Sequence, residues 1–151
     1  MKINIYTINR SKQDEFTNIV KNYQKMISKY AQIEDISIFN KKISKAQNIG
    51  KKHAKSAYTE AFLPYMKGYN IALDPHGKEL NSLKFYKIFD ITTKLNFFIA
   101  GAFGFEDAFL AKCDSVISLS QLTFGHKIAK VILYEQIYRS FSIKNNHPYH
   151  K

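Results

Sequence analysis

Asn96-Phe97-Phe98-Ile99-Ala100, followed by Gly101-Ala102-Phe103-Gly104, is the stretch around which the rest of this sequence is organised. The first five residues predict a buried strand, and the glycines predict a turn at its end. A short helix, a second strand and a polar loop, Leu119-Ser120-Gln121-Leu122-Thr123-Phe124, are predicted to follow before His126. Strands that end in loops of small or hydroxyl-bearing residues match an open α/β sheet, which binds ligands beyond the carboxyl ends of its strands. We therefore expect the functional site at this edge.

Upstream of this stretch, strand and helix patterns alternate. Lys2–Ile8 is predicted to be the first strand. Apolar residues then recur every three or four positions, which predicts a helix with one core-facing stripe: Phe16, Ile19, Val20, Tyr23, Met26, Ile27 and Tyr30. A second strand is predicted around Ile33, Ile36, Ile38 and Phe39.

The next segment combines lysines with helical spacing. One continuous helix is predicted from Ile43 to Pro64, with its lysines outward and with His53 half-exposed or hydrogen-bonded rather than bound to a metal. Tyr69–Leu73 predicts a third strand. Asp74-Pro75-His76-Gly77 predicts a turn, because proline fixes one backbone angle and glycine permits positive φ. Ser82 is expected to cap the helix that follows.

Alternating strands and helices indicate an α/β fold, with a mainly parallel sheet and helices on both faces. Residues 1–151 fit one domain.

The longest apolar run, Phe97 to Phe105, is far shorter than the roughly 20 residues of a membrane helix, and no targeting segment is visible, so no membrane partner is expected. Cys113 is the only cysteine, which suits a reducing cytosol and predicts a small buried side chain. We expect a cytoplasmic protein without a metal.

The charge balance indicates a polyanionic partner. The chain has 23 Lys and Arg residues against 12 Asp and Glu, a net charge of +11 and a pI near 9.6. Six lysines and no acid lie between Ile36 and Thr59, and Glu135 is the only acid from Ser115 to Lys151. A solvated lysine face would explain either region alone, but two such regions in one small domain favour RNA.

Three segments carry a family resemblance: Phe98–Gly104, Ser118–His126 and His147–Lys151. They resemble the signatures of the RlmH family, SPOUT-class methyltransferases that methylate the N3 nitrogen of a pseudouridine in 23S ribosomal RNA. The resemblance spans the whole chain and is strongest from Leu73 onward.

Two residues depart from the family pattern. Ala100 stands where a glycine is usual, which slightly tightens the approach of a ligand. Gly125 stands where a proline is usual, which loosens the start of the last helix. Neither change removes a chemical group.

The resemblance implies a deep trefoil knot whose three loops bind S-adenosylmethionine. The residues implied to bind this cofactor are Leu73, Gly101, Gly104, Leu119, Ser120, Gln121, Leu122, Thr123 and Phe124. By themselves Gly101 and Gly104 would be a weak signal, because glycine pairs mostly mark turns, and their spacing is not that of dinucleotide- or triphosphate-binding motifs. Methyl transfer from a sulfonium needs no metal; it needs a nucleophile in line with the methyl group.

The resemblance also implies a set of catalytic candidates. Because N3 of pseudouridine carries a proton, the site must remove that proton or stabilise the resulting anion. The candidates are His126, Arg139, Tyr149 and His150. Arg139 could instead anchor a phosphate, and His126 could cap the last helix. Glu135 is expected to face outward or to pair with a lysine.

The last helix carries more apolar residues than one core-facing stripe needs, which predicts a homodimer: Ile128, Val131, Ile132, Tyr134 and Ile137. In the family the tail His147–Lys151 folds over the donor site, in our interpretation that of the partner subunit.

The resulting hypothesis is a methyltransferase that acts on 23S ribosomal RNA in the ribosome. A non-catalytic basic RNA-binding module and a doubly wound protein for a small phosphorylated ligand are the alternatives. The presence of all three donor loops favours the enzyme.

Overall fold

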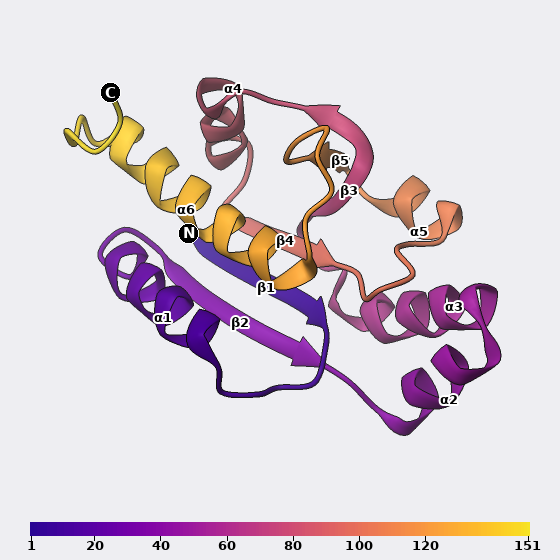
Figure 1. Ribbon diagram of the computed structural model, residues 1–151. Coiled ribbons are helices and arrows are strands. Elements are labelled where there is room, and N and C mark those ends of the chain that lie inside the picture. The colour runs from indigo at the N-terminus through magenta and orange to yellow at the C-terminus, as the bar shows by residue number, and fades with distance from the viewer.

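The computed structural model describes all residues from Met1 to Lys151 and contains one five-stranded sheet with helices on both faces (Figure 1). The strands are β1 (Lys2–Ile8), β2 (Gln32–Ile38), β3 (Tyr69–Glu79), β4 (Lys94–Ile99) and β5 (Ser115–Ser118). The helices are α1 (Glu15–Ile27), α2 (Lys41–Ile49), α3 (Lys51–Phe62), α4 (Ser82–Tyr86), α5 (Asp107–Lys112) and α6 (His126–Lys144). Two short 3-10 helices are η1 (Leu63–Tyr65) and η2 (Lys87–Asp90). This architecture confirms the predicted α/β class.

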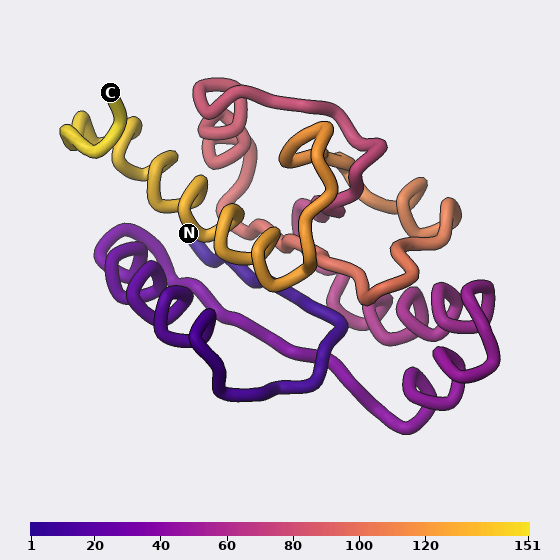
Figure 2. The backbone as a smooth tube through the Cα atoms, in the orientation of Figure 1, coloured from indigo at the N-terminus to yellow at the C-terminus, as the bar shows by residue number.

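The sheet has the order β2-β1-β4-β3-β5, and every neighbouring pair of strands is parallel. Strand β4, which contains most of the buried run 96–100, therefore lies at the centre between β1 and β3. The backbone after β5 runs through a loop into the first turn of α6, near the carboxyl ends of β1 and β4 (Figure 2). The edge predicted to be functional is the edge at which α6 begins.

Side chains of the strands alternate between two cores, one on each face of the sheet, as the strand period of two requires. Ile3 and Ile5 of β1 and Phe97 of β4 face the core that contains α1, α4 and α6. Tyr6 and Phe98 face the core that contains α2, α3 and α5. The molecule thus has three layers, and α6 packs across β1 and β4 (Figure 1).

Three buried asparagines link the central strands. Asn4 Nδ2 donates to Asn96 Oδ1 at 2.8 Å, and Asn96 Nδ2 donates to Asn70 Oδ1 at 3.0 Å. These residues are register partners, Asn4 with Asn96 and Asn70 with Asn96. A slip of one residue would turn a strand's asparagine to the opposite face and leave buried amides without partners, so this ladder favours the observed register.

The lysine-rich segment forms two helices, so the prediction of one continuous helix is wrong. Gly50 separates α2 from α3 with a φ of 151°, a conformation that favours glycine. Ile49, which the spacing placed in the apolar stripe, is 66% exposed, whereas Ala54 and Tyr58 are fully buried. Both helices pack on the same core. The helical spacing of apolar residues therefore continues across Gly50, and the sequence pattern does not reveal the break. His53 is exposed.

Strand β3 is longer than predicted, and the predicted turn at Asp74-Pro75-His76-Gly77 lies inside it. Its register against β5 shifts between Leu73 and Lys78, as in a bulge. One feature typical of a turn remains, a local hydrogen bond from His76 N to Asp74 Oδ1 at 2.9 Å. The proline and glycine therefore mark an irregular strand rather than its end.

Helix α4 is capped by Asn81, so the predicted cap at Ser82 is wrong. Asn81 Oδ1 accepts a hydrogen bond from the Lys84 backbone N–H at 2.8 Å. The Ser82 hydroxyl instead donates to Gln136 Oε1 of α6 at 2.8 Å. Both residue types are good caps, and the tertiary contact with α6 decided between them.

Cys113 is only partly buried, against the α2, α3 and α5 side of the sheet. Burial raises the pKa of its thiol to about 12, so the thiol is protonated at neutral pH. None of the helices is both long and apolar enough to cross a bilayer.

Candidate active site

A cavity of about 420 Å³, the strand-end cavity, opens at the carboxyl ends of β4 and β5, beside the irregular part of β3. Its walls are the irregular part of β3 at Leu73–Pro75, the loops after β4 and β5, and the first turn of α6. Eight of the nine residues that the family resemblance assigned to the cofactor line it: Leu73, Gly101, Gly104, Leu119, Ser120, Leu122, Thr123 and Phe124. Gln121 is exposed and does not line it. Ala100 and Gly125, the two departures from the family pattern, line it as well.

Serine side chains shape the loop after β5. The Ser118 hydroxyl donates to the Ser120 backbone oxygen at 2.8 Å, and Ser120 Oγ accepts from the Leu122 backbone N–H at 3.0 Å. The Leu122 side chain is left 72% exposed at the wall of the cavity. It is therefore available to pack on a bound ligand.

The turn after β4 needs glycine at two positions for different reasons. A hydrogen bond from Gly104 N to Gly101 O at 3.1 Å closes the turn. At Gly101 an added Cβ would lie 2.6 Å from the Tyr58 hydroxyl oxygen, so core packing sets this constraint. Gly104 has a φ of 78°, in the left-handed region, and no atom lies within 4 Å of an added Cβ. Gly104 therefore borders open space.

His126 begins α6 and lines the strand-end cavity. It does not cap the helix, because Gly125 occupies the N-cap position and no side chain makes a capping hydrogen bond. Burial lowers the pKa of His126, and the charges of Lys127 and Lys130 lower it further. The imidazole is therefore mostly neutral at pH 7, with a ring nitrogen able to accept a proton.

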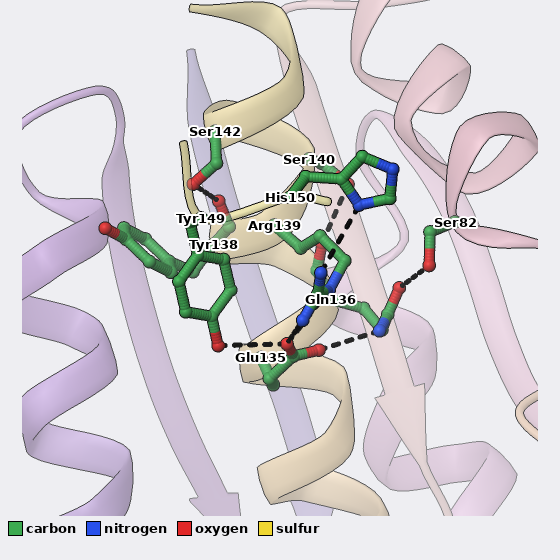
Figure 3. Close-up of polar contacts among 9 residues, drawn as sticks. All are labelled: Ser82, Glu135, Gln136, Tyr138, Arg139, Ser140, Ser142, Tyr149 and His150. Atoms are coloured by element: carbon green, nitrogen blue, oxygen red, sulfur yellow. Dashed lines mark hydrogen bonds and ion pairs between the residues drawn. The ribbon is translucent and has the colours of Figure 1, made fainter. Parts of the chain in front are cut away.

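The other three catalytic candidates lie together in a tail cluster against the C-terminal half of α6, joined by Glu135: Arg139, Tyr149 and His150 (Figure 3). Arg139 donates to Glu135 Oε1 from Nε at 3.0 Å and from Nη2 at 2.5 Å, and the Tyr149 hydroxyl donates to the same oxygen at 3.0 Å. Arg139 Nη1 lies 3.3 Å from His150 Nδ1. Glu135 thus pairs with arginine and tyrosine, and the expected lysine partner is wrong.

Protonation in the tail cluster follows from these contacts. The hydrogen bond to Glu135 raises the pKa of Arg139. Burial raises the pKa of Tyr149, and Glu135 raises it further. At neutral pH the guanidinium is charged and the phenol keeps its proton, so both groups act as hydrogen-bond donors rather than as bases.

The tail cluster and His126 lie at different parts of α6. Arg139 follows His126 by 13 positions on this helix, which corresponds to roughly 20 Å along its axis. A single chain therefore does not bring the four catalytic candidates to one point.

Comparison with solved structures finds the same fold elsewhere. A structure described as a probable methylase family protein from Haemophilus influenzae Rd KW20 superimposes with a TM-score of 0.57 at 15% sequence identity. The match covers 99% of this chain and 70% of that chain. At this identity the likeness concerns the fold alone.

Sequence relatives are much closer. The ribosomal RNA large subunit methyltransferase H of Campylobacter jejuni subsp. jejuni is 50% identical over 151 residues, and that of Aliarcobacter butzleri (strain RM4018) is 55% identical, each covering both chains completely. Residues 1–150 also match the family described as Predicted SPOUT methyltransferase. The chain belongs to the RlmH family of SPOUT methyltransferases.

The strand-end cavity of this SPOUT methyltransferase fits a nucleoside-sized ligand. Its volume falls within the range of about 300 to 1,000 Å³ that is common for small-molecule sites. Leu73, Leu119 and Phe124 supply apolar walls, and the loop backbones supply polar groups. No three His, Cys, Asp or Glu side chains are placed to hold a metal ion.

A second cavity of this SPOUT methyltransferase was missed by the sequence motifs. This basic cavity, of about 390 Å³, lies beside the carboxyl ends of β1 and β2, and His126 lines it together with the strand-end cavity. The polar run Asn9–Gln13, directly after β1, forms part of its wall. That run was the available signal, because loops after parallel strands meet at one edge of the sheet.

Proposed function

We propose that this protein transfers a methyl group from S-adenosylmethionine to the N3 nitrogen of a pseudouridine in 23S ribosomal RNA, acting on the ribosome in the cytoplasm. The observation that carries the proposal is the strand-end cavity, where residues of β3 meet residues of the loops after β4 and β5. The names of relatives at 50% and 55% identity support ribosomal RNA as the substrate. The net charge of +11 suits a polyanionic partner.

S-adenosylmethionine, when bound, supplies an electrophilic methyl group on a sulfonium. Leu73, Leu119 and Phe124 would enclose its apolar parts, and exposed Leu122 would pack on it. Gly104 leaves the space that a side chain would fill. The backbone groups of the loops after β4 and β5 would be available to hydrogen-bond its adenine edge.

Of the four catalytic candidates, the two histidines are the groups suited to take the N3 proton. Arg139 and Tyr149 hold their protons at neutral pH, because the pKa of each is raised. His126 borders the cavity and has a lowered pKa, so it is available as a base. Arg139 and Tyr149 then serve as donors that stabilise the anion of the pseudouridine.

The active site belongs to a homodimer in which the tail cluster of one subunit completes the strand-end cavity of the other. The roughly 20 Å between His126 and Arg139 along α6 supports this arrangement, because the two groups of one chain cannot reach one substrate atom. Ile128, near the start of α6, is 42% exposed and available to an interface. Tyr134 and Ile137 are buried in the chain's own core, so they do not add to it.

Two measurements test the proposal. Calorimetric titration with S-adenosylhomocysteine should show saturable binding. Transfer from labelled S-adenosylmethionine to ribosomes that lack the modification should yield a methylated pseudouridine, identified by mass spectrometry of the nucleosides. Ribosome binding without S-adenosylhomocysteine binding would favour the non-catalytic module, and a different methylated nucleoside would overturn the target.

A further inference from the structure

The basic cavity adjoins the strand-end cavity at the first turn of α6. His126 lines both, so the two cavities lie on either side of this residue. Together they extend along the carboxyl edge of the whole sheet, from β2 to β5. A ligand longer than one nucleoside could occupy both.

The acids of the basic cavity are already matched within the protein. Lys127 binds Asp14, and this hydrogen bond is the main cause of the lowered pKa of Asp14. Lys130 Nζ lies 2.7 Å from Asp35 Oδ1, and the Tyr134 hydroxyl donates to Asp35 Oδ2 at 2.9 Å. Neither carboxylate is therefore free to neutralise another cation.

Three further cations line the same cavity and form no ion pair: Arg10, Lys12 and Lys21. The Arg10 guanidinium lies over the Phe39 ring, 4.4 Å from its centroid, which orients the side chain without neutralising it. The cavity thus presents three unmatched positive charges beside a wall of hydrogen-bonding groups. This combination suits a phosphate.

We propose that the basic cavity binds a phosphodiester of the RNA chain next to the nucleotide that is methylated. The inference rests on the proposed function and adds a place for the acceptor strand. Arg10, Lys12 and Lys21 contact the phosphate oxygens, which fixes the register of the RNA without reading its sequence. With the phosphate on one side of His126, the target base turns out of its stack toward the strand-end cavity on the other side.

Replacing two of the three unmatched cations tests this site. The variant combines Arg10→Gln with Lys12→Gln, and its affinity for ribosomes lacking the modification is measured by filter binding over a range of salt concentrations. Each lost phosphate contact removes about 0.7 to 0.9 from the slope of log affinity against log salt, so the slope should fall by roughly 1.5. Lys21→Gln alone should lower it by about half as much.

The matched control combines Lys25→Gln with Lys29→Gln, which removes the same charge near the other end of α1, outside the basic cavity. Its salt slope should stay close to that of the wild type. S-adenosylhomocysteine affinity should be unchanged in every variant, because none of these residues lines the strand-end cavity. If the Arg10→Gln, Lys12→Gln variant has the same slope of log affinity against log salt as the control, the phosphate site is refuted. Failure of the wild type to bind S-adenosylhomocysteine would refute the methyltransferase proposal. The comparison of salt slopes would still show whether the basic cavity contacts RNA.

Discussion

Tyr58 fills the space beside Gly101, so that a Cβ at Gly101 would lie 2.6 Å from the tyrosine hydroxyl oxygen and 2.8 Å from its ring carbon Cζ. Tyr58 belongs to α3, is fully buried and accepts a hydrogen bond from Gln47 Nε2 at 2.6 Å. The turn that forms one wall of the strand-end cavity thus packs against the core on the opposite face of the sheet from α6. The shape of the cavity depends on packing in that core.

Gly101→Ala should therefore act first on stability. The added methyl meets a buried ring that cannot move freely, and such overpacking typically costs about 1 to 3 kcal/mol. Urea unfolding should show this loss in the free energy of unfolding, and S-adenosylhomocysteine affinity should fall with it because the turn shifts. A free energy of unfolding equal to that of the wild type would contradict the packing argument.

Gly104→Val should act on cofactor binding while the fold persists. No protein atom lies within 4 Å of an added Cβ at Gly104, so the valine projects into open space beside the cavity. The positive φ of 78° adds backbone strain of about 1 to 2 kcal/mol. Calorimetry should detect no S-adenosylhomocysteine binding, and far-UV circular dichroism should stay near that of the wild type. Unchanged affinity would remove Gly104 from the cofactor site.

Gly125→Pro should stabilise the protein. Gly125 has a φ of −58°, which proline adopts without strain, and its N–H donates no backbone hydrogen bond. Reduced freedom of the unfolded chain should add about 0.4 to 1 kcal/mol to the free energy of unfolding, measurable as a higher Tm. Gly50→Pro is the control and should destabilise, because Gly50 has a φ of 151° and donates to Ala46 O at 3.1 Å.

His126 should titrate below the ordinary histidine value of about 6.5. Because its pKa is lowered in the folded state, the unfolded chain binds more protons just below pH 6.5. Its contribution to stability is therefore fully present above that pH and declines as pH falls through the window between the two pKa values. NMR titration of the imidazole should give a midpoint below 6.5, and His126→Gln should remove this part of the pH dependence. A midpoint at or above 6.5 would show that burial does not determine the pKa of this imidazole.

The class of the fold could be predicted from sequence because apolar periodicity directly reflects which faces are buried. The first strand, Lys2–Ile8, has the predicted bounds, and the central strand begins only two residues earlier than Asn96. Periodicity failed where two elements share one core, as at Gly50 between α2 and α3. Turn-forming residue types gave the wrong prediction within β3, where Pro75 and Gly77 occupy an irregular strand.

The candidate site was predictable in part, and the resemblance to RlmH supplied the assignment of its loops to a cofactor. Gln121 was included because of its position in the loop, but the loop's local hydrogen bonds leave it exposed. The ion pairs of the basic cavity could not be predicted, because they join residues far apart in the sequence, Asp14 with Lys127 and Asp35 with Lys130. The fold-back of the tail onto α6 is likewise a tertiary contact.

A mixture of two inactive subunits tests whether the active site is shared. One subunit carries Gly104→Val and keeps its tail. The other lacks residues 148–151, and therefore Tyr149 and His150, and keeps its strand-end cavity. Each alone should be inactive, the first because it binds no cofactor. The second should lose about 100- to 10,000-fold in rate because a positioned acid–base group is gone, while its S-adenosylhomocysteine binding survives.

Refolding the two subunits together in equal amounts should restore activity. Random pairing makes half of the dimers mixed, and each mixed dimer has one complete site, so roughly a quarter of the wild-type rate should return. If the tail served the cavity of its own chain, a mixed dimer would contain no complete site and the mixture would stay inactive. Mass spectrometry of the intact dimers shows that mixed species have formed, which separates this outcome from failed exchange. Mixed dimers without methyl transfer would therefore place the catalytic contribution of Tyr149 and His150 within one chain.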